Sequence, residues 1–266
     1  MNFNAINKKE TLAEKVAKTI KEAIIKGKLK SGESISTESV LAEQFNVSKA
    51  VIRDAARILM AWGLIEIRHG KGMYVTEEMN SYFLESISTI LRRTGANSWE
   101  MQEYEQFILP EVFAQAAIHA TENQKLEIEK KGQKYIDFIW ADSGNTLEKD
   151  TDAIQKKLIL EFMESIFKAT NNRVLSLMGQ IQQILREMRH ITDDVGREQD
   201  LLSLEEKSIR LMIEAVKLGD SDYAKKLVSK IFRIGPKIEK IMRKTKIGEI
   251  ISIPADIFFE EIVLDD

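Results

Sequence analysis

Apolar residues near the start of the chain recur at helical spacing. One face of the segment 10–26 carries an aliphatic residue at every fourth position, at Leu12, Val16, Ile20 and Ile24. Residues four apart lie above one another on a helix, so this spacing predicts an amphipathic helix with one buried face. We expect the helix to pack beneath the elements that follow it.

Two more helices are predicted next, separated by a short turn. The Ser-Thr pair at 36–37 offers an N-cap for a helix that runs to Phe45, and residues 46–48 predict a tight turn. A helix over 48–62 follows, which its own first serine can cap and which Gly63 ends. Two helices joined by so short a turn are typical of a helix-turn-helix.

Beyond Gly63 the helical period gives way to alternation. Residues 64–68 and 73–75 alternate apolar with polar around the glycine-rich turn 69–72, which predicts a β-hairpin. The preceding helix over 48–62 carries three basic residues among its apolar ones, and the hairpin turn is basic as well. A helix-turn-helix followed by a basic hairpin has the order of parts that DNA binding by a winged helix requires.

From Tyr82 onward the pattern is almost purely helical. Pro110 and Pro236 fall inside predicted helices and are expected to kink them. The polar residues 76–80 form the predicted linker between two domains. The helices are expected over seven segments: 81–94, 98–120, 123–141, 149–169, 173–192, 200–218 and 221–245.

The expected fold class is mainly α, in two domains. Domain 1–76 is a winged helix-turn-helix with a short β-hairpin wing, and domain 81–266 is an antiparallel bundle of six to seven helices. The apolar tail 247–266 is expected to pack on its own domain rather than on a partner subunit, because apolar segments are rarely left in solvent.

Charge supports this division into two parts. The whole chain has a net charge of −3. Residues 1–76 hold 13 Lys and Arg against 8 Asp and Glu, a net charge of +5, and the rest holds 26 against 34, a net charge of −8. A basic module joined to an acidic body is what a DNA-binding domain on a sensory domain would show.

Composition also excludes some classes of protein. The chain has no cysteine, so neither a disulfide framework nor a thiolate zinc site is possible. No run of 18 apolar residues occurs, and residues 1–10 lack an apolar secretory core. We therefore expect a cytoplasmic protein with no membrane partner.

Several short motifs between 12 and 75 occur in the same order in a known family. They are Ile-Ile-Lys-Gly-Lys-Leu-Lys-Ser-Gly at 24–32, Leu41-Ala42, Val47-Ser48, Ile52-Arg53, Gly63-Leu64 and Gly70-Lys71-Gly72. Through them, residues 12–75 resemble the DNA-binding domain of the GntR transcriptional regulators. The remaining length resembles, more weakly, the effector domain of the FadR subfamily. The resemblance implies a regulator without enzymatic activity, which binds a palindromic double-stranded operator as a homodimer.

By this resemblance, the helix over 48–62 is the recognition helix and residues 69–71 form the wing tip. An arginine can contact guanine or phosphate through its planar guanidinium, whereas a lysine acts as a point charge. Arg57, one turn beyond the expected contacts, is predicted to be solvated. The residues expected to contact DNA are Ser48, Lys49, Arg53, His69, Gly70 and Lys71.

Many FadR-like effector domains bind a divalent metal through one Asp and three His. Aligned by resemblance, those four positions are apolar in this chain: Ile159, Met163, Ile209 and Ile231. A divalent ion needs oxygen or imidazole ligands, so we expect neither a metal nor another cofactor. An arginine common near the start of the family's effector domain aligns with Glu105.

The apolar positions leave two alternatives for the helical body. They could line a pocket for a small hydrophobic effector such as a fatty acid or acyl-coenzyme A. Its anionic head could then face Arg186 and Arg189, which are otherwise expected to be solvated. In the second alternative, Phe162, Phe167 and Phe232 close the interior, and the regulator works without a ligand. A helical enzyme is a third possibility, but the sequence contains no convincing catalytic motif.

Overall fold

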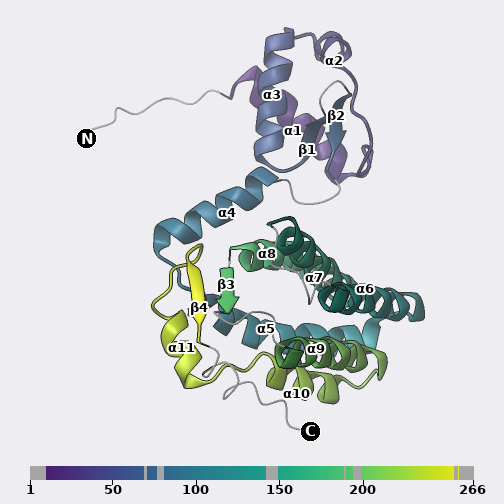
Figure 1. Cartoon of the computed structure of the whole chain (residues 1–266). Helices are drawn as coiled ribbons and strands as arrows, with labels where there is room; N and C mark the ends of the chain where they lie inside the picture. The colour runs from purple at the N-terminus through teal and green to yellow at the C-terminus, as the bar shows by residue number, and fades with distance from the viewer. Residues whose placement is uncertain are drawn as a thin grey trace. The chain divides into compact units, whose positions relative to one another are not determined.

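The computed structural model describes residues 10–68, 71–76, 81–141, 149–188, 190–193, 199–254 and 257. Backbone contacts divide the chain into two units, Met1–Ile87 and Ser88–Asp266. The first contains three helices and a hairpin, and the second is mainly helical (Figure 1). This architecture confirms the predicted fold class. Among the described helices, none is both long and apolar enough to cross a lipid bilayer.

The N-terminal unit has the order of a winged helix-turn-helix. Its elements are α1 (Leu12–Ile25), α2 (Glu38–Phe45), α3 (Lys49–Ala61), β1 (Ile65–Arg68) and β2 (Gly72–Val75). Each helix begins after a Ser or Thr side chain that accepts a hydrogen bond from the backbone of the first turn. Helical spacing turns Val16, Ile20, Ile52 and Leu59 into one core. Among the described residues of this unit, every buried side chain is apolar.

One strand beside the wing was not predicted from the sequence. Residues 32–35 lie along β2, where the Ile35 N–H donates to the carbonyl of Met73 over 2.8 Å. The Val75 N–H donates in turn to the carbonyl of Glu33 over 2.9 Å. β1 and β2 pair antiparallel, as predicted. The added segment has a single apolar residue, so alternation could not reveal it.

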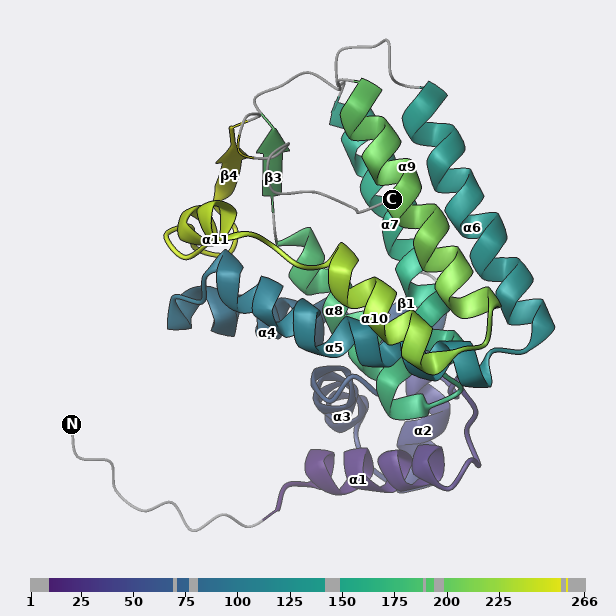
Figure 2. The same ribbon diagram turned by 90° about the horizontal axis from the view of Figure 1, so that it is seen from below.

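The larger unit is a helical body with α5 near its centre. Its helices, together with the one that crosses the unit boundary, are α4 (Ser81–Thr94), α5 (Ser98–His119), α6 (Glu122–Ala141), α7 (Lys149–Ala169), α8 (Arg173–Glu187), α9 (Gln199–Lys217), α10 (Ser221–Ile231) and α11 (Pro236–Met242). α5 packs against α7, α9 and α10, and Figure 2 shows α10 alongside it. α6 packs against α7 and α9. α4 supplies residues to both units, because the boundary after Ile87 falls inside it.

The prediction that this part is purely helical was wrong at two places in the chain. α8 ends at Glu187 rather than at 192, and His190–Asp193 form the strand β3. β3 pairs in parallel with β4 (Ile250–Ile253), and Ile191 lies opposite Ile251. β-branched residues favour strands in both segments, but the segments are far apart in the sequence. A local helical period cannot show such a pairing.

The predicted helix over 221–245 is also two helices. α10 ends at Ile231, and α11 begins at Pro236 after Gly235 in an extended conformation. Proline lacks the N–H that a helix interior needs, and it restricts the residue before it to extended angles. It therefore starts a helix here rather than kinking one. Pro110, in contrast, lies inside α5 as predicted.

The C-terminal segment packs on the helical body as far as the structure describes it. Ile247 is buried beside Met188, and Ile251 is buried in a cluster around Trp99. These contacts confirm the expectation that the tail packs on its own domain up to β4. Residues 258–266 lie outside the described residues.

A glycine in this segment permits a close approach to α4. Gly248 has a φ of +91°, and a Cβ at this position would overlap the guanidinium of Arg92. Only a residue without a side chain meets both conditions, the left-handed angle and the missing volume. The segment before β4 is therefore fitted to the second half of α4.

Candidate nucleic-acid interface and effector region

The turn between α2 and α3 is fixed by two short polar residues. α2 ends at Asn46, whose φ of 50° is left-handed, a conformation that asparagine adopts more readily than most residues. The Ser48 Oγ then accepts a hydrogen bond from the Val51 N–H over 3.3 Å. The other N–H groups of the first turn of α3 have no intrahelical partner, which suits them to bind phosphate.

α3 buries one face and exposes the other. Ile52 and Leu59 are buried, and α3 packs against α1 and α2. Lys49 and Arg53 are exposed, and because they lie four residues apart they share one face over the first two turns. The structure thus brings the predicted contacts Ser48, Lys49 and Arg53 together at the start of one helix.

Two arginines of α3 differ in how firmly they are held. Arg57 Nη1 donates to Asp54 Oδ1 on the same helix over 2.9 Å. Arg53 Nη1 lies 4.0 Å from Glu38 Oε2, at the outer limit of an ion pair, and donates no hydrogen bond to any described residue. The Arg53 side chain is 58% exposed, so its guanidinium can turn to an external acceptor at little cost.

The hairpin between β1 and β2 carries Lys71 in its exposed turn. The Lys71 N–H donates to the carbonyl of Arg68 over 2.9 Å, which closes the turn. The Arg68 guanidinium stacks 4.4 Å from the centre of the Tyr74 ring and is held on the sheet. Lys71 forms no ion pair with a described residue and is the more available cation. His69 and Gly70, also predicted to contact DNA, lie outside the described residues.

Comparison with known proteins identifies this arrangement. Residues 12–75 match the family described as bacterial regulatory proteins, gntR family. The HTH-type transcriptional regulator LutR of Bacillus subtilis (strain 168) is 30% identical over 165 residues, which cover 62% of this chain and 73% of that protein. The chain belongs to the GntR family. It is a DNA-binding transcriptional regulator.

Other relatives extend the similarity over both units. The galactonate operon transcriptional repressor of Escherichia coli (strain K12) is 23% identical to this GntR regulator over 221 residues, which cover 79% of the chain and 89% of that protein. A solved structure of a Streptococcus agalactiae GntR covers 86% of the chain and 99% of its own length, with a TM-score of 0.62 and 19% identity. At that identity the likeness shows the fold alone.

The four positions predicted to line an effector pocket meet in the core of the helical body. Met163 on α7 and Ile209 on α9 are buried, and Ile159 and Ile231 pack half-buried against the same cluster. None of the four offers an oxygen or nitrogen donor, so they do not fit the metal that the FadR resemblance implies. Within the described residues, no group of three or more His, Asp or Glu side chains is placed to hold an ion.

Aromatic rings pack this region closely. A Cβ at Gly132 on α6 would lie 2.6 Å from Ile213 Cδ1 and 3.0 Å from Phe162 Cε2. A Cβ at Gly179 on α8 would lie 2.7 Å from Phe167 Cγ. Such distances are shorter than van der Waals contact, so the two glycines exist where the rings leave no space. Phe162 and Phe167 therefore fill the interior beside the four positions.

Sequence reasoning missed a polar network at one end of the same interior. Glu105 on α5 is 0% exposed, and it accepts hydrogen bonds from Gln182 Nε2 over 2.6 Å and from Arg186 Nε over 2.9 Å. The expectation that Arg186 is solvated was wrong, because an ion pair with Glu105 draws it inward. The signal available was that Gln182 and Arg186 continue the buried stripe of α8 that begins at Leu175 and Gly179. Arg189 lies outside the described residues.

A second polar group involves α6, α7 and α9. The Tyr135 hydroxyl donates to Glu205 Oε1, and Gln155 Nε2 donates to the Tyr135 hydroxyl over 3.1 Å. Burial and the neighbouring Glu205 raise the pKa of Tyr135, and the Arg186 guanidinium acts against them by lowering it. Arg186 is thus within electrostatic reach of Tyr135, which links the two polar groups.

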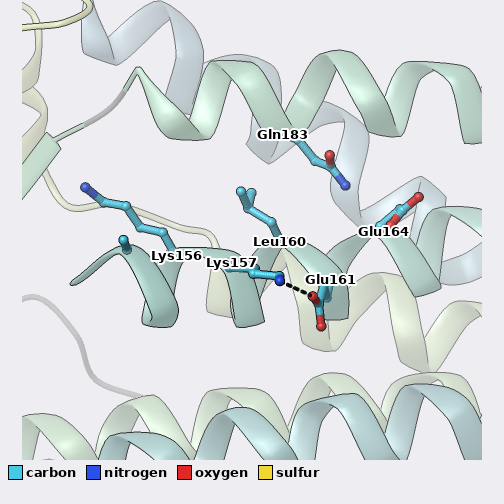
Figure 3. Close-up of a pocket in the computed structure, with 7 residues that line it drawn as sticks. Lys156, Lys157, Leu160, Glu161, Glu164 and Gln183 are labelled. Carbon is cyan, nitrogen blue, oxygen red and sulfur yellow. Dashed lines mark ion pairs between the residues drawn. The ribbon is translucent and has the colours of Figure 1, made fainter. Parts of the chain in front are cut away.

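A surface pocket of about 410 Å³ lies between α7 and α8, away from these groups. Figure 3 shows Gln183 reaching toward it from α8, opposite Leu160 of α7. Lys157 Nζ and Glu161 Oε1 lie 3.9 Å apart at its edge. The pocket includes none of the four predicted effector positions, and its lining is mainly charged. It does not provide the apolar cavity that the sequence predicted.

Proposed function

We propose that this GntR regulator binds a palindromic operator as a homodimer in the cytoplasm. In this proposal residues 1–76 bind DNA, and residues 81–266 bind an effector and join the two subunits. The observation that carries the DNA-binding half is the pair of exposed cations, Lys49 and Arg53, at the capped start of α3. The remaining contacts would come from Ser48, His69, Gly70 and Lys71.

Symmetry supports the dimer. A two-fold dimer presents two recognition helices related in the same way as the two half-sites of a palindrome. An effector that favours one dimer arrangement over another would change the spacing of these helices and hence the affinity for the operator. Sensing and DNA binding then need no direct contact between the ligand and DNA.

For the helical body we propose a FadR-like effector domain that responds to a small, mainly hydrophobic ligand. The support is the cluster of apolar side chains at Ile159, Met163, Ile209 and Ile231, where a chain of hydrocarbon would meet no unpaired polar atom. A fatty acid or an acyl-coenzyme A is the ligand class that the sequence predicted.

A regulator that needs no ligand is the second candidate. The observation that favours it is the packing of Phe162 and Phe167 against Gly132 and Gly179, which leaves little room beside the four positions. The two candidates differ in the response of operator binding to added ligand. Neither requires catalysis, and the relatives of this chain are named as transcriptional regulators.

The DNA-binding proposal is tested with duplexes that the full chain selects from a random library. Arg53→Ala should weaken binding to the selected duplex by about 1–3 kcal/mol, the value of one good charged contact to a base or phosphate. Fluorescence anisotropy at fixed salt measures the dissociation constant. Arg57→Ala is the matched control, since Arg57 is tied to Asp54 and should leave the affinity unchanged.

Two results would contradict this assignment. Equal losses for Arg53→Ala and Arg57→Ala would mean that only the overall charge of α3 matters. Unchanged binding by Arg53→Ala would mean that α3 is not the recognition helix.

A further inference from the structure

Polar side chains from five helices converge inside the helical body. Glu105 comes from α5 and Arg186 from α8, and they form an ion pair with the carboxylate fully buried. Tyr135 from α6 and Glu205 from α9 form a second hydrogen-bonded group, to which α7 adds Gln155. Apolar residues of similar volume would be as stable as a buried ion pair or more so, which makes stability alone a weak reason to keep one here.

One buried atom of this network has an unused hydrogen-bonding capacity. Gln182 is 1% exposed, and its Nε2 donates to Glu105. Its carbonyl oxygen Oε1 accepts no hydrogen bond from any described residue. A buried acceptor without a donor costs free energy, and such atoms are rare in native structures. A ligand that supplies an N–H or O–H would remove that cost.

The polar groups lie next to the apolar positions along the same helices. Gln155 precedes Ile159 by four residues on α7, and Glu205 precedes Ile209 by four residues on α9. Residues four apart are neighbours on one helix face, so each polar residue is one turn from an apolar one. This juxtaposition suits an amphipathic molecule, with its head at the polar end and its hydrocarbon along the apolar side chains.

We propose that Gln182, Glu105, Arg186 and Tyr135 form the head-group site for an effector whose head is a hydrogen-bond donor, a hydroxyl or an amine, and not a free carboxylate. This inference rests on the proposed effector-binding function and narrows its ligand class. The surfaces on offer are acceptors, namely the Gln182 carbonyl and the carboxylates of Glu105 and Glu205. A second carboxylate brought among them would be repelled by like charge at low dielectric.

The position of α8 gives this site a route to the rest of the chain. α8 carries Gln182 and Arg186, and it ends at Met188, which is buried with Ile247. Leu91 of α4 packs against the same cluster. A head group that shifts α8 would therefore press on α4, the helix that supplies residues to both units.

The test uses three ligands with the same ten-carbon chain: 1-decanol, decylamine and decanoate. They are added separately to the full chain, below their micellar concentrations, and binding is measured by thermal shift and by calorimetry. We expect the alcohol or the amine to bind and raise the melting temperature, and decanoate to bind at least about tenfold more weakly. Binding of all three with equal affinity, or of none, would overturn the proposal.

Paired variants on α8 locate the site. Gln182→Met removes the unpaired carbonyl and should weaken binding of the preferred ligand about tenfold, the loss expected for one buried hydrogen bond. Gln183→Met is the matched control, because Gln183 lines the surface pocket between α7 and α8 and not the polar network. Equal losses from the two variants would overturn the assignment of the site.

A charge variant keeps the test decisive if Gln182→Met is poorly folded. Glu105→Gln keeps the shape of the side chain and removes one carboxylate, so decanoate should gain affinity relative to decylamine. An unchanged ratio would overturn the proposal. Operator binding without ligand is measured on the same samples: if it is normal while no head-group preference appears, the head-group inference fails alone. If the operator is not bound at all, the proposed function fails.

Discussion

The N-terminal unit and the helical body bury different kinds of side chain. In the N-terminal unit, among the residues that the structure describes, the core is wholly apolar, and cations such as Lys49 and Arg53 lie outside. In the helical body, Glu105, Gln102 and Gln182 are buried. Gln102 is held there by a hydrogen bond from its Nε2 to the carbonyl of Phe232, 2.9 Å away.

The difference follows from the size of what each unit is suited to bind. DNA is larger than the unit that reads it, so the groups that contact it must stand on the surface, where they cost little to maintain. A small molecule is recognised best when it is removed from water, so the groups that contact it lie inside and must be paired while they wait. Buried polar groups in this chain therefore mark the sensory region.

The largest expected effect sharpens this contrast by adding a charge inside the wrong part of the body. Ile209→Asp would place an unpaired carboxylate in the apolar core, and we expect it to destabilise the body by about 3–5 kcal/mol. The melting temperature and the operator affinity are measured together. Leu126→Asp on α6 is the control, because Leu126 is 62% exposed and should tolerate the change.

The outcome of this variant also separates the two candidates for the body. If Ile209 lines a ligand cavity, the response to ligand should disappear while melting and operator binding are largely kept. A fall in both would mean that the four apolar positions form a closed core. Equal destabilisation by Leu126→Asp would show that the body tolerates no added charge, wherever it is placed.

A smaller effect is expected at the cap of the recognition helix. Ser48→Ala removes the acceptor for the Val51 N–H and should destabilise α3 by about 1 kcal/mol. Hydrogen exchange of the α3 amides measures this locally. Ser39→Ala on α2 is the control, since Ser39 lies inside a helix and caps nothing. Equal exchange in the two variants would remove Ser48 as the determinant of where α3 begins.

The smallest effect concerns the wing, and it appears in salt dependence. Lys71→Ala should weaken binding to selected and unrelated duplexes alike, because a lysine contact to phosphate carries no sequence information. The slope of the logarithm of the binding constant against the logarithm of salt concentration should fall by about 0.9. Lys226→Ala on the exposed face of α10 serves as the control. A loss confined to the selected duplex would mean that Lys71 reads bases.

The sequence predicted those parts of the fold that are set by local signals. α3 was expected over 48–62 and spans Lys49–Ala61, because a cap, a stripe of apolar residues and Gly63 all lie within one short segment. The pairing of β3 with β4 could not be predicted, since each strand is specified by the other across a long stretch of chain. The same limit applies to the polar network, because apolar periodicity does not show a charge that is neutralised from another helix.

Gly248 places an unusual demand on the chain. It lies beyond all the helices of the body that the structure describes, yet its lack of a side chain decides whether the Arg92 guanidinium can rest against the backbone beside it. Arg92 lies in the second half of α4, and the first half of the same helix belongs to the N-terminal unit. Whatever the body senses has to be transmitted along that helix. A single hydrogen atom near the end of the chain thus stands guard over the signal sent to its beginning.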